Sequence, residues 1–214
     1  MKRAGFLTVM AFTALMAAVP AGATVVSSLP DGVIVPIPPA ADTIGFGMGP
    51  VGFGPGITWT STSASSVFGY DNARGYGFDA NGFWNSLLLP MAGLDDTTGT
   101  MTFAFDMPVA GVGGFVNYSP TYGPATLAVY DSSFNLLESE SLTFTTDLQF
   151  NGGEFVGFLR DTPDIRYFTL SDSFVGVTQF TVQDMVAAAP VPEPGTLVLL
   201  GAGVAGLLTR KRRA

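Results

Sequence analysis

The chain has 214 residues, a formal net charge of −8, no cysteine and no histidine. Without those two side chains it holds no disulfide, and it supplies no cysteine nucleophile, Ser-His-Asp triad or histidine-ligated zinc. Between residues 24 and 189, 16 acidic side chains stand against three arginines and no lysine, a net charge of −13 for this body. Nucleic-acid binding requires Lys and Arg to neutralise phosphates, so we expect no nucleic-acid partner and no binding to anionic membrane surfaces.

The N-terminal segment has the pattern of a secretory signal peptide. Two basic residues precede an apolar run over residues 6–19, and small residues follow at Ala21 and Ala23. A basic start, an apolar centre and an Ala-x-Ala site are typical of a segment that signal peptidase removes during export. We expect residues 1–23 to be such a peptide, cleaved after Ala23; the alternative is a retained anchor.

Residues 24–56 are rich in glycine and contain six prolines. Proline fixes φ and lacks a backbone N–H, so this density excludes a regular helix and a central strand. We expect an irregular lead-in with one edge strand near residues 32–35.

From residue 57 to 186 the hydrophobic pattern has a period of two. Met101, Phe103 and Phe105, for example, alternate with polar or small residues. Short β-branched and aromatic runs separated by Gly, Pro, Asn and Asp are typical of an all-β sandwich. The sequence therefore predicts an all-β fold with one β-sandwich domain over 57–186, and a small-residue linker over 187–190. The expected strands are 57–61, 101–106, 114–118, 127–129, 142–145, 155–159, 165–170 and 177–182.

One segment of this body combines aromatic rings with short oxygen-bearing side chains. Tyr70, Tyr76 and Trp84 are candidate platforms for a glycan, because a sugar site needs apolar ring faces and a few placed polar groups. Asp79 and Asn81 are candidate calcium ligands, because calcium takes carboxylate, amide and carbonyl oxygens. The alternative is that Gly, Asn and Asp form turns here and the rings belong to the core. We expect no cofactor.

Glu138 and Glu140 are the candidates for catalysis. They lie two residues apart, which places them on one face if the segment is a strand. Two carboxylates can hydrolyse a glycoside, but carboxylates on an exposed strand are more commonly solvated charge. We therefore expect the protein not to be an enzyme.

Residues 191–214 begin with a stiff acidic handle. Pro192 and Pro194 flank Glu193, and each proline favours an extended residue before it. Such a handle does not continue a helix from upstream. It offers a fixed shape and one charge to an enzyme at a membrane surface.

An apolar run over 196–208 and a basic cluster over 210–213 follow the handle. As a helix the run measures about 20 Å, shorter than the ~30 Å hydrocarbon core of a bilayer. Long basic side chains reach from the helix end to the interface and extend the span. The alternative for a run of this length is a buried core helix. The order of the three parts predicts a sorting tag with a transmembrane helix over about 196–208, which holds the precursor in the membrane.

The handle, the apolar run and the basic cluster together resemble the PEP-CTERM sorting signal of exported bacterial proteins. The resemblance implies that Pro192, Glu193 and Pro194 are the motif read by an exosortase, a separate membrane-embedded cysteine transpeptidase that cleaves nearby. It also implies that the body is released or passed to the cell envelope and its exopolysaccharide.

The body is similar to the jelly-roll domains of other exported proteins that carry this signal. The similarity rests on glycines and on the spacing of four runs, at 109–115, 127–131, 155–158 and 163–165. It implies a jelly-roll-like sandwich, similar in outline to lectins and carbohydrate-binding modules.

Two functional interpretations follow. The first is an exported, non-catalytic cell-envelope or extracellular-matrix protein, processed at its C-terminus and retained in or beyond the envelope, with exopolysaccharide as a candidate partner. The second is a carbohydrate- or calcium-binding β-sandwich module.

Overall fold

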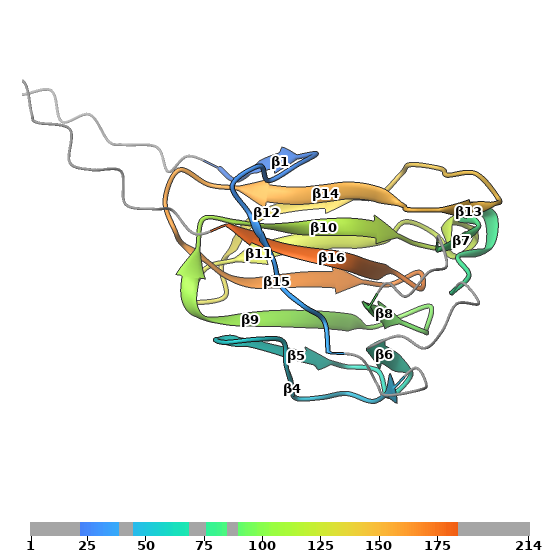
Figure 1. The fold of residues 1–214 in the computed structure, drawn as a ribbon, viewed down its shortest axis with the longest axis horizontal. Coiled ribbons are helices and arrows are strands. Elements are labelled where there is room, and N and C mark those ends of the chain that lie inside the picture. Colours follow the sequence, from blue (N-terminus) through green and yellow to red (C-terminus); the bar gives the residue numbers. More distant parts are fainter. Residues whose placement is uncertain (1–21, 39–44, 69–75, 85–89, 184–214) are drawn as a thin grey trace, which may run out of the picture.

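Nearly every element of the described chain is a β-strand. A computed structural model describes residues 22–38, 45–68, 76–84 and 90–183 (Figure 1). Within those ranges the helical elements are two single turns of 3-10 helix, η1 (Asp79–Asn81) and η2 (Pro120–Tyr122). The all-β prediction is therefore confirmed.

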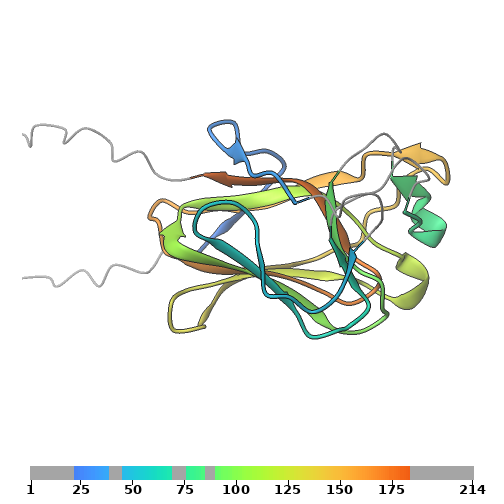
Figure 2. The same cartoon turned by 60° about the horizontal axis from the view of Figure 1, so that its bottom comes forward.

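The strands form two antiparallel sheets that lie face to face (Figure 2). The first sheet runs β1 (Thr24–Val26), β14 (Glu154–Leu159), β10 (Gly111–Asn117), β16 (Gly176–Gln183), β8 (Met91–Leu94), β6 (Ser66–Phe68) and β3 (Gly45–Phe46), and β2 (Val33–Ile34) also pairs with β16. The second sheet runs β12 (Leu136–Ser141), β11 (Thr126–Tyr130), β15 (Ile165–Ser171), β9 (Thr100–Val109), β5 (Ile57–Ser61) and β4 (Val51–Gly52). A small parallel pair, β7 (Phe83–Trp84) with β13 (Phe150–Asn151), lies at one end (Figure 1). The arrangement is sandwich-like, and jelly-roll connectivity stays a prediction.

The core lies between the two sheets and is rich in aromatic rings. Phe103 of β9 stacks on Phe180 of β16 with ring centroids 4.3 Å apart, and Phe168 of β15 meets Phe158 of β14 at 6.2 Å. All four rings are fully buried. The period of two in β9 causes this packing, because it turns alternate side chains towards the opposite sheet. Burial of each such side chain stabilises the fold by about 1.5–3 kcal/mol.

The glycines of β10 and β14 allow two backbones to approach closely. Gly113 is paired with Gly157. A Cβ added to Gly113 would lie 2.6 Å from the Cα of Gly157. The glycine run in β10 is thus a packing requirement of this strand pair.

The lead-in belongs to the folded unit, which corrects the predicted boundary at residue 57. Ile37 and Phe53 are buried in the core, and β1 extends the first sheet beyond β14. The expected edge strand is present as β2. Prolines keep this stretch out of central strand positions but let it cover the sheet edges.

One predicted strand is misplaced. The strand expected at 142–145 is β12, at Leu136–Ser141, because the ladder with β11 ends at Ser141. Leu142 still donates its N–H to the carbonyl of Ala125, and the chain then leaves the sheet. The other seven predicted strands overlap β5, β9, β10, β11, β14, β15 and β16. The sequence did not predict the short strands β1, β3, β4, β6, β7, β8 and β13.

Candidate functional site

The predicted sorting residues lie outside the described part of the chain. This holds for Pro192, Glu193 and Pro194, for the expected helix over 196–208, and for the linker over 187–190. Within the described ranges no helix is long and apolar enough to cross a membrane.

The two residues of the predicted signal cleavage site lie on either side of the point where the described part of the chain begins. Ala21 is not among the described residues, whereas Ala23 is 7% exposed and packs in the core directly before β1. The structure therefore places the expected cleavage point at the first residue of the edge strand.

Trp84 does not present a ring face to a ligand, which corrects its assignment as a glycan platform. It is 2% exposed and packs with Val67, Phe78 and Met91 in a second small core. Its ring meets Phe78 edge-on, with centroids 5.0 Å apart and an interplanar angle of 86°. The hydrophobic gain of burying so large a ring holds it inside. Of its two predicted partners, Tyr70 lies outside the described residues.

Tyr76, the other predicted partner, covers this small core. Its ring packs on Phe78 at 5.3 Å, and its hydroxyl donates to Asp95 Oδ1 at 2.8 Å. Burial, together with the hydrogen bond to Asp95, raises the pKa of Tyr76 far above its ordinary value. The hydroxyl is thus engaged in an intramolecular hydrogen bond at the surface.

Asn81 joins separate segments of the chain instead of offering free oxygens. It is fully buried. Its backbone carbonyl accepts from Thr146 Oγ1 at 2.7 Å, Asn151 Nδ2 at 2.9 Å and Asn117 Nδ2 at 3.2 Å. Its side-chain Oδ1 accepts from the N–H of Thr146 at 3.1 Å. Asn81 therefore does not fit the predicted calcium site.

The turn that carries Asn81 ends at a glycine for a steric reason. Gly82 has a φ of 70°, and a Cβ there would lie 2.4 Å from the carbonyl oxygens of Asp147 and Gln149. Asp79, the other predicted calcium ligand, is exposed at the start of the same turn. Among the described residues no group of three or more acidic side chains is placed to hold a metal ion.

Glu138 and Glu140 lie on one face of β12, as predicted. They are paired with Val129 and Leu127, both buried, so they point inward at the open edge of the second sheet. Glu140 lines a cleft of about 420 Å³ whose wall also includes Val25, Phe144 and Glu154. Inward charges at a sheet edge hinder pairing with another chain. This protective role accounts for the position of the two glutamates without a catalytic role.

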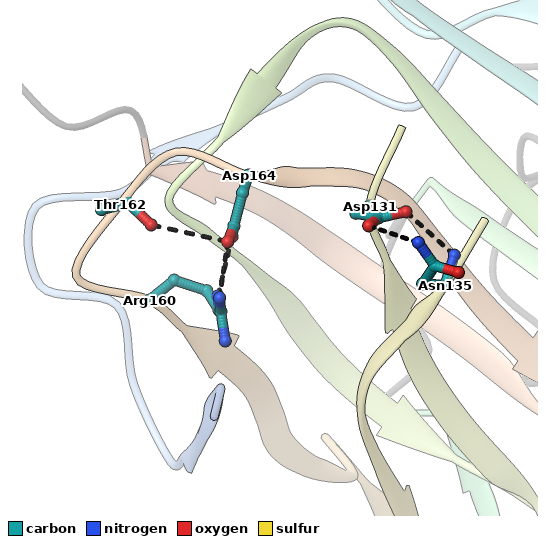
Figure 3. A network of polar contacts seen from close by, with 5 residues as sticks. All are labelled: Asp131, Asn135, Arg160, Thr162 and Asp164. Carbon is teal, nitrogen blue, oxygen red and sulfur yellow. Dashed lines mark hydrogen bonds and ion pairs between the residues drawn. The ribbon is translucent and has the colours of Figure 1, made fainter. Parts of the chain in front are cut away.

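Two polar turns lie at the same end of the sandwich (Figure 3). Asp131 accepts from the side-chain amide of Asn135 at 2.8 Å, which holds the pKa of Asp131 below its usual range. In the turn between β14 and β15, Arg160 Nε donates to Asp164 Oδ1 at 2.7 Å. This ion pair raises the pKa of Arg160. Both turns are therefore held by internal charge-assisted hydrogen bonds.

Three aromatic residues that the sequence did not single out lie together at the Asp131 turn, one in the turn itself and two on the adjoining strands. Phe134 stacks on Tyr130 with centroids 4.5 Å apart and an angle of 14°, and it meets Tyr167 at 5.0 Å. Tyr130 and Tyr167 are direct partners on β11 and β15. Phe134 is 56% exposed. We call these three residues the aromatic cluster.

The comparisons with known proteins concern the C-terminal segment. Residues 190–213 match the family model of the PEP-CTERM protein-sorting motif. No curated protein matches the chain. The match contains Pro192, Glu193 and Pro194, and it implies an exported precursor that is anchored at the envelope. The chain therefore carries a C-terminal PEP-CTERM protein-sorting motif, as expected of an exosortase substrate.

Proposed function

We propose that this protein is a non-catalytic structural component of the cell envelope or extracellular matrix. On this proposal, signal peptidase removes residues 1–23 and an exosortase then processes the C-terminal signal. The body is delivered outside the cell and retained in or near exopolysaccharide. The sorting motif at residues 190–213 is the observation that carries the proposal.

Three features of the body support a non-catalytic role. The chain has no histidine or cysteine. The inward carboxylates of β12 fit the protection of a sheet edge. The buried polar residues Asn81 and Asn117 are satisfied by hydrogen bonds that join chain segments. A body with a net charge of −13 also stays soluble in a hydrated matrix.

The experiment compares a variant of the sorting motif with a matched control. Pro192→Ala with Pro194→Ala removes the stiffness of the handle, whereas Pro190→Ala removes a proline that lies just before it. We expect the double variant to accumulate as a membrane-bound precursor in the native host, and the Pro190→Ala protein to be processed like the wild type. Immunoblots of membrane, periplasmic and extracellular fractions measure this. Equal processing of the double variant and the wild type would contradict the proposal.

A further inference from the structure

Phe134 occupies a backbone position that suits glycine. Its φ is 62°, and bulky residues are rare in the left-handed region because Cβ crowds the next carbonyl. The turn is held in this shape because Asp131 Oδ1 accepts from the N–H groups of Ser133 and Asn135. Contacts with Tyr130 and Tyr167 offset part of the strain, yet the ring remains 56% exposed. A strained residue that presents its side chain to solvent indicates a use for that side chain.

The outer face of the second sheet continues from the aromatic cluster as a field of short hydroxyl side chains. In the β12-β11-β15-β9 register, one row pairs Ser141, Thr126, Ser171 and Thr100. The next row holds Ser139 and Thr102 at its ends, with the buried residues Ala128 and Thr169 between them. Neighbouring strands lie about 4.8 Å apart, and successive side chains on one face about 6.8 Å apart. The six exposed or half-buried hydroxyls are Thr100, Thr102, Thr126, Ser139, Ser141 and Ser171. The face therefore offers hydroxyl donors and acceptors beside one exposed ring, Phe134, and two half-buried ones, and Thr100 and Ser171 already share one hydrogen bond.

The absence of charge from these rows of the second sheet narrows the chemical class of ligand that could bind there. The two hydroxyl rows and the Tyr130–Tyr167 row contain no charged side chain. Asp131 and Asp164, at the same end, are engaged by Asn135 and Arg160 (Figure 3). Asp161 adds one exposed carboxylate in the second turn, near Arg160, and one carboxylate does not make a cation site. A divalent cation would need free carboxylate oxygens, and an anionic polymer would need Lys or Arg to offset the repulsion from a body of net charge −13.

An uncharged sugar polymer satisfies all these conditions. The apolar C–H face of a pyranose packs on the negative face of an aromatic ring. Its hydroxyls exchange hydrogen bonds with serine and threonine. We propose that the aromatic cluster and the adjoining hydroxyl rows are a binding surface for a neutral polysaccharide. This surface is separate from the predicted site at Tyr70, Tyr76 and Trp84, and it does not depend on how the C-terminus is processed.

The test measures binding of the full chain to immobilised polysaccharides. The protein is purified in a detergent without a sugar head group, so that the micelle does not compete. Biosensor channels carry dextran, galactomannan or mixed-linkage β-glucan, and a parallel channel carries the polyanion alginate. We expect saturable binding to at least one neutral polysaccharide and none to alginate. Phe134→Gly and Tyr167→Ala should each weaken binding roughly tenfold, because each removes a stacking ring.

Phe150→Ala is the matched control. Phe150 is 58% exposed, close to the value for Phe134, but it lies on β13 in the small parallel sheet. This variant should bind like the wild type. Phe134→Gly should melt within a few degrees of the wild type, since glycine accepts the positive φ while the stacking contact is lost.

Several outcomes would overturn the proposal. Absence of binding to all three neutral polysaccharides, equal binding of alginate, or unchanged binding by Phe134→Gly would each do so. A large fall in the melting temperature of Phe134→Gly would assign the ring to stability instead. The wild type could bind no glycan and yet form a dimer, seen by light scattering, that Phe134→Gly dissociates. That result would make the face an interface between copies of this chain.

Discussion

Asn81 illustrates how one buried amide can fix several segments at the residue scale. Its carbonyl and its side chain bind groups from four other residues, at positions 117, 144, 146 and 151. We expect Asn81→Ala to lower the free energy of unfolding by about 1–3 kcal/mol, because the N–H of Thr146 loses its partner. Denaturant unfolding measures this, and a loss below about 0.5 kcal/mol would contradict it. Because these oxygens are occupied, millimolar calcium should leave the melting temperature of the wild type unchanged.

A second prediction concerns the stability contribution of Trp84, because its ring is part of the hydrophobic core and not a ligand platform. Trp84→Ala should cost about 3–5 kcal/mol of stability, the range for truncation of a buried aromatic ring. Trp84→Phe should cost much less, since it keeps most of the volume and removes an indole N–H that has no hydrogen-bond partner in the described structure. Thermal and urea unfolding of the two variants compare these costs. Similar stability of Trp84→Ala and the wild type would show that the ring is not buried.

Asp131 predicts a pH dependence of stability. Hydrogen bonds, chiefly from the Asn135 side chain, lower the pKa of the Asp131 carboxyl in the folded protein. Its contribution to stability is therefore present above the unfolded pKa of about 3.9 and is lost as pH falls through the lower folded value. The wild type should melt above Asp131→Asn at pH 7, and the gap should close as pH falls below about 4. A gap that does not change between pH 7 and pH 2 would contradict this assignment.

The limits of prediction at this scale follow from the chemistry of turns. The sequence placed Tyr76 and Trp84 among Gly, Asn and Asp, and such a context does not reveal which ring faces the core. Phe134 stands among polar turn residues, between Asp131 and Asn135. That context is as ambiguous as the one around Trp84, which is buried, so it does not by itself predict the exposure of Phe134.

At the element scale, the period of two predicted the central strands well. β5 was predicted with its observed bounds, and β9 and β15 closely, because their inward residues are large and apolar. β12 was missed because its inward positions include Glu138 and Glu140, so the alternation is hidden. The strands of the lead-in are only two or three residues long, which is too short for a pattern to appear.

The inward charges of β12 make a prediction for aggregation. Glu138→Leu with Glu140→Leu should shorten the time to aggregation at a fixed temperature, because an apolar edge strand offers a template for another chain. Ser139→Leu adds a leucine to the opposite face without removing charge, and it should aggregate more slowly than the double variant. Light scattering follows both. If the double variant aggregates as slowly as the wild type, or more slowly, the glutamates do not protect the sheet edge.

At the scale of the whole molecule, the sequence divides the chain into a body and two terminal segments. The all-β character of the body followed from its alternation and turn residues, and the structure confirms it. The edge strand near residues 32–35 was predicted, but the pairing of β1 with β14 was not, because it depends on long-range contacts. The C-terminal motif was recognisable because its three parts occur in order, and residues 190–213 match the family model.

The central claim is that the body is exported and separated from both terminal segments. The most direct measurement is the intact mass of the protein isolated from the envelope and medium of its native host. The account predicts a chain that begins at Thr24 and ends near Pro194, with or without an attached mass. A full-length chain of 22.3 kDa, recovered from the cytosol with both ends intact, would contradict it.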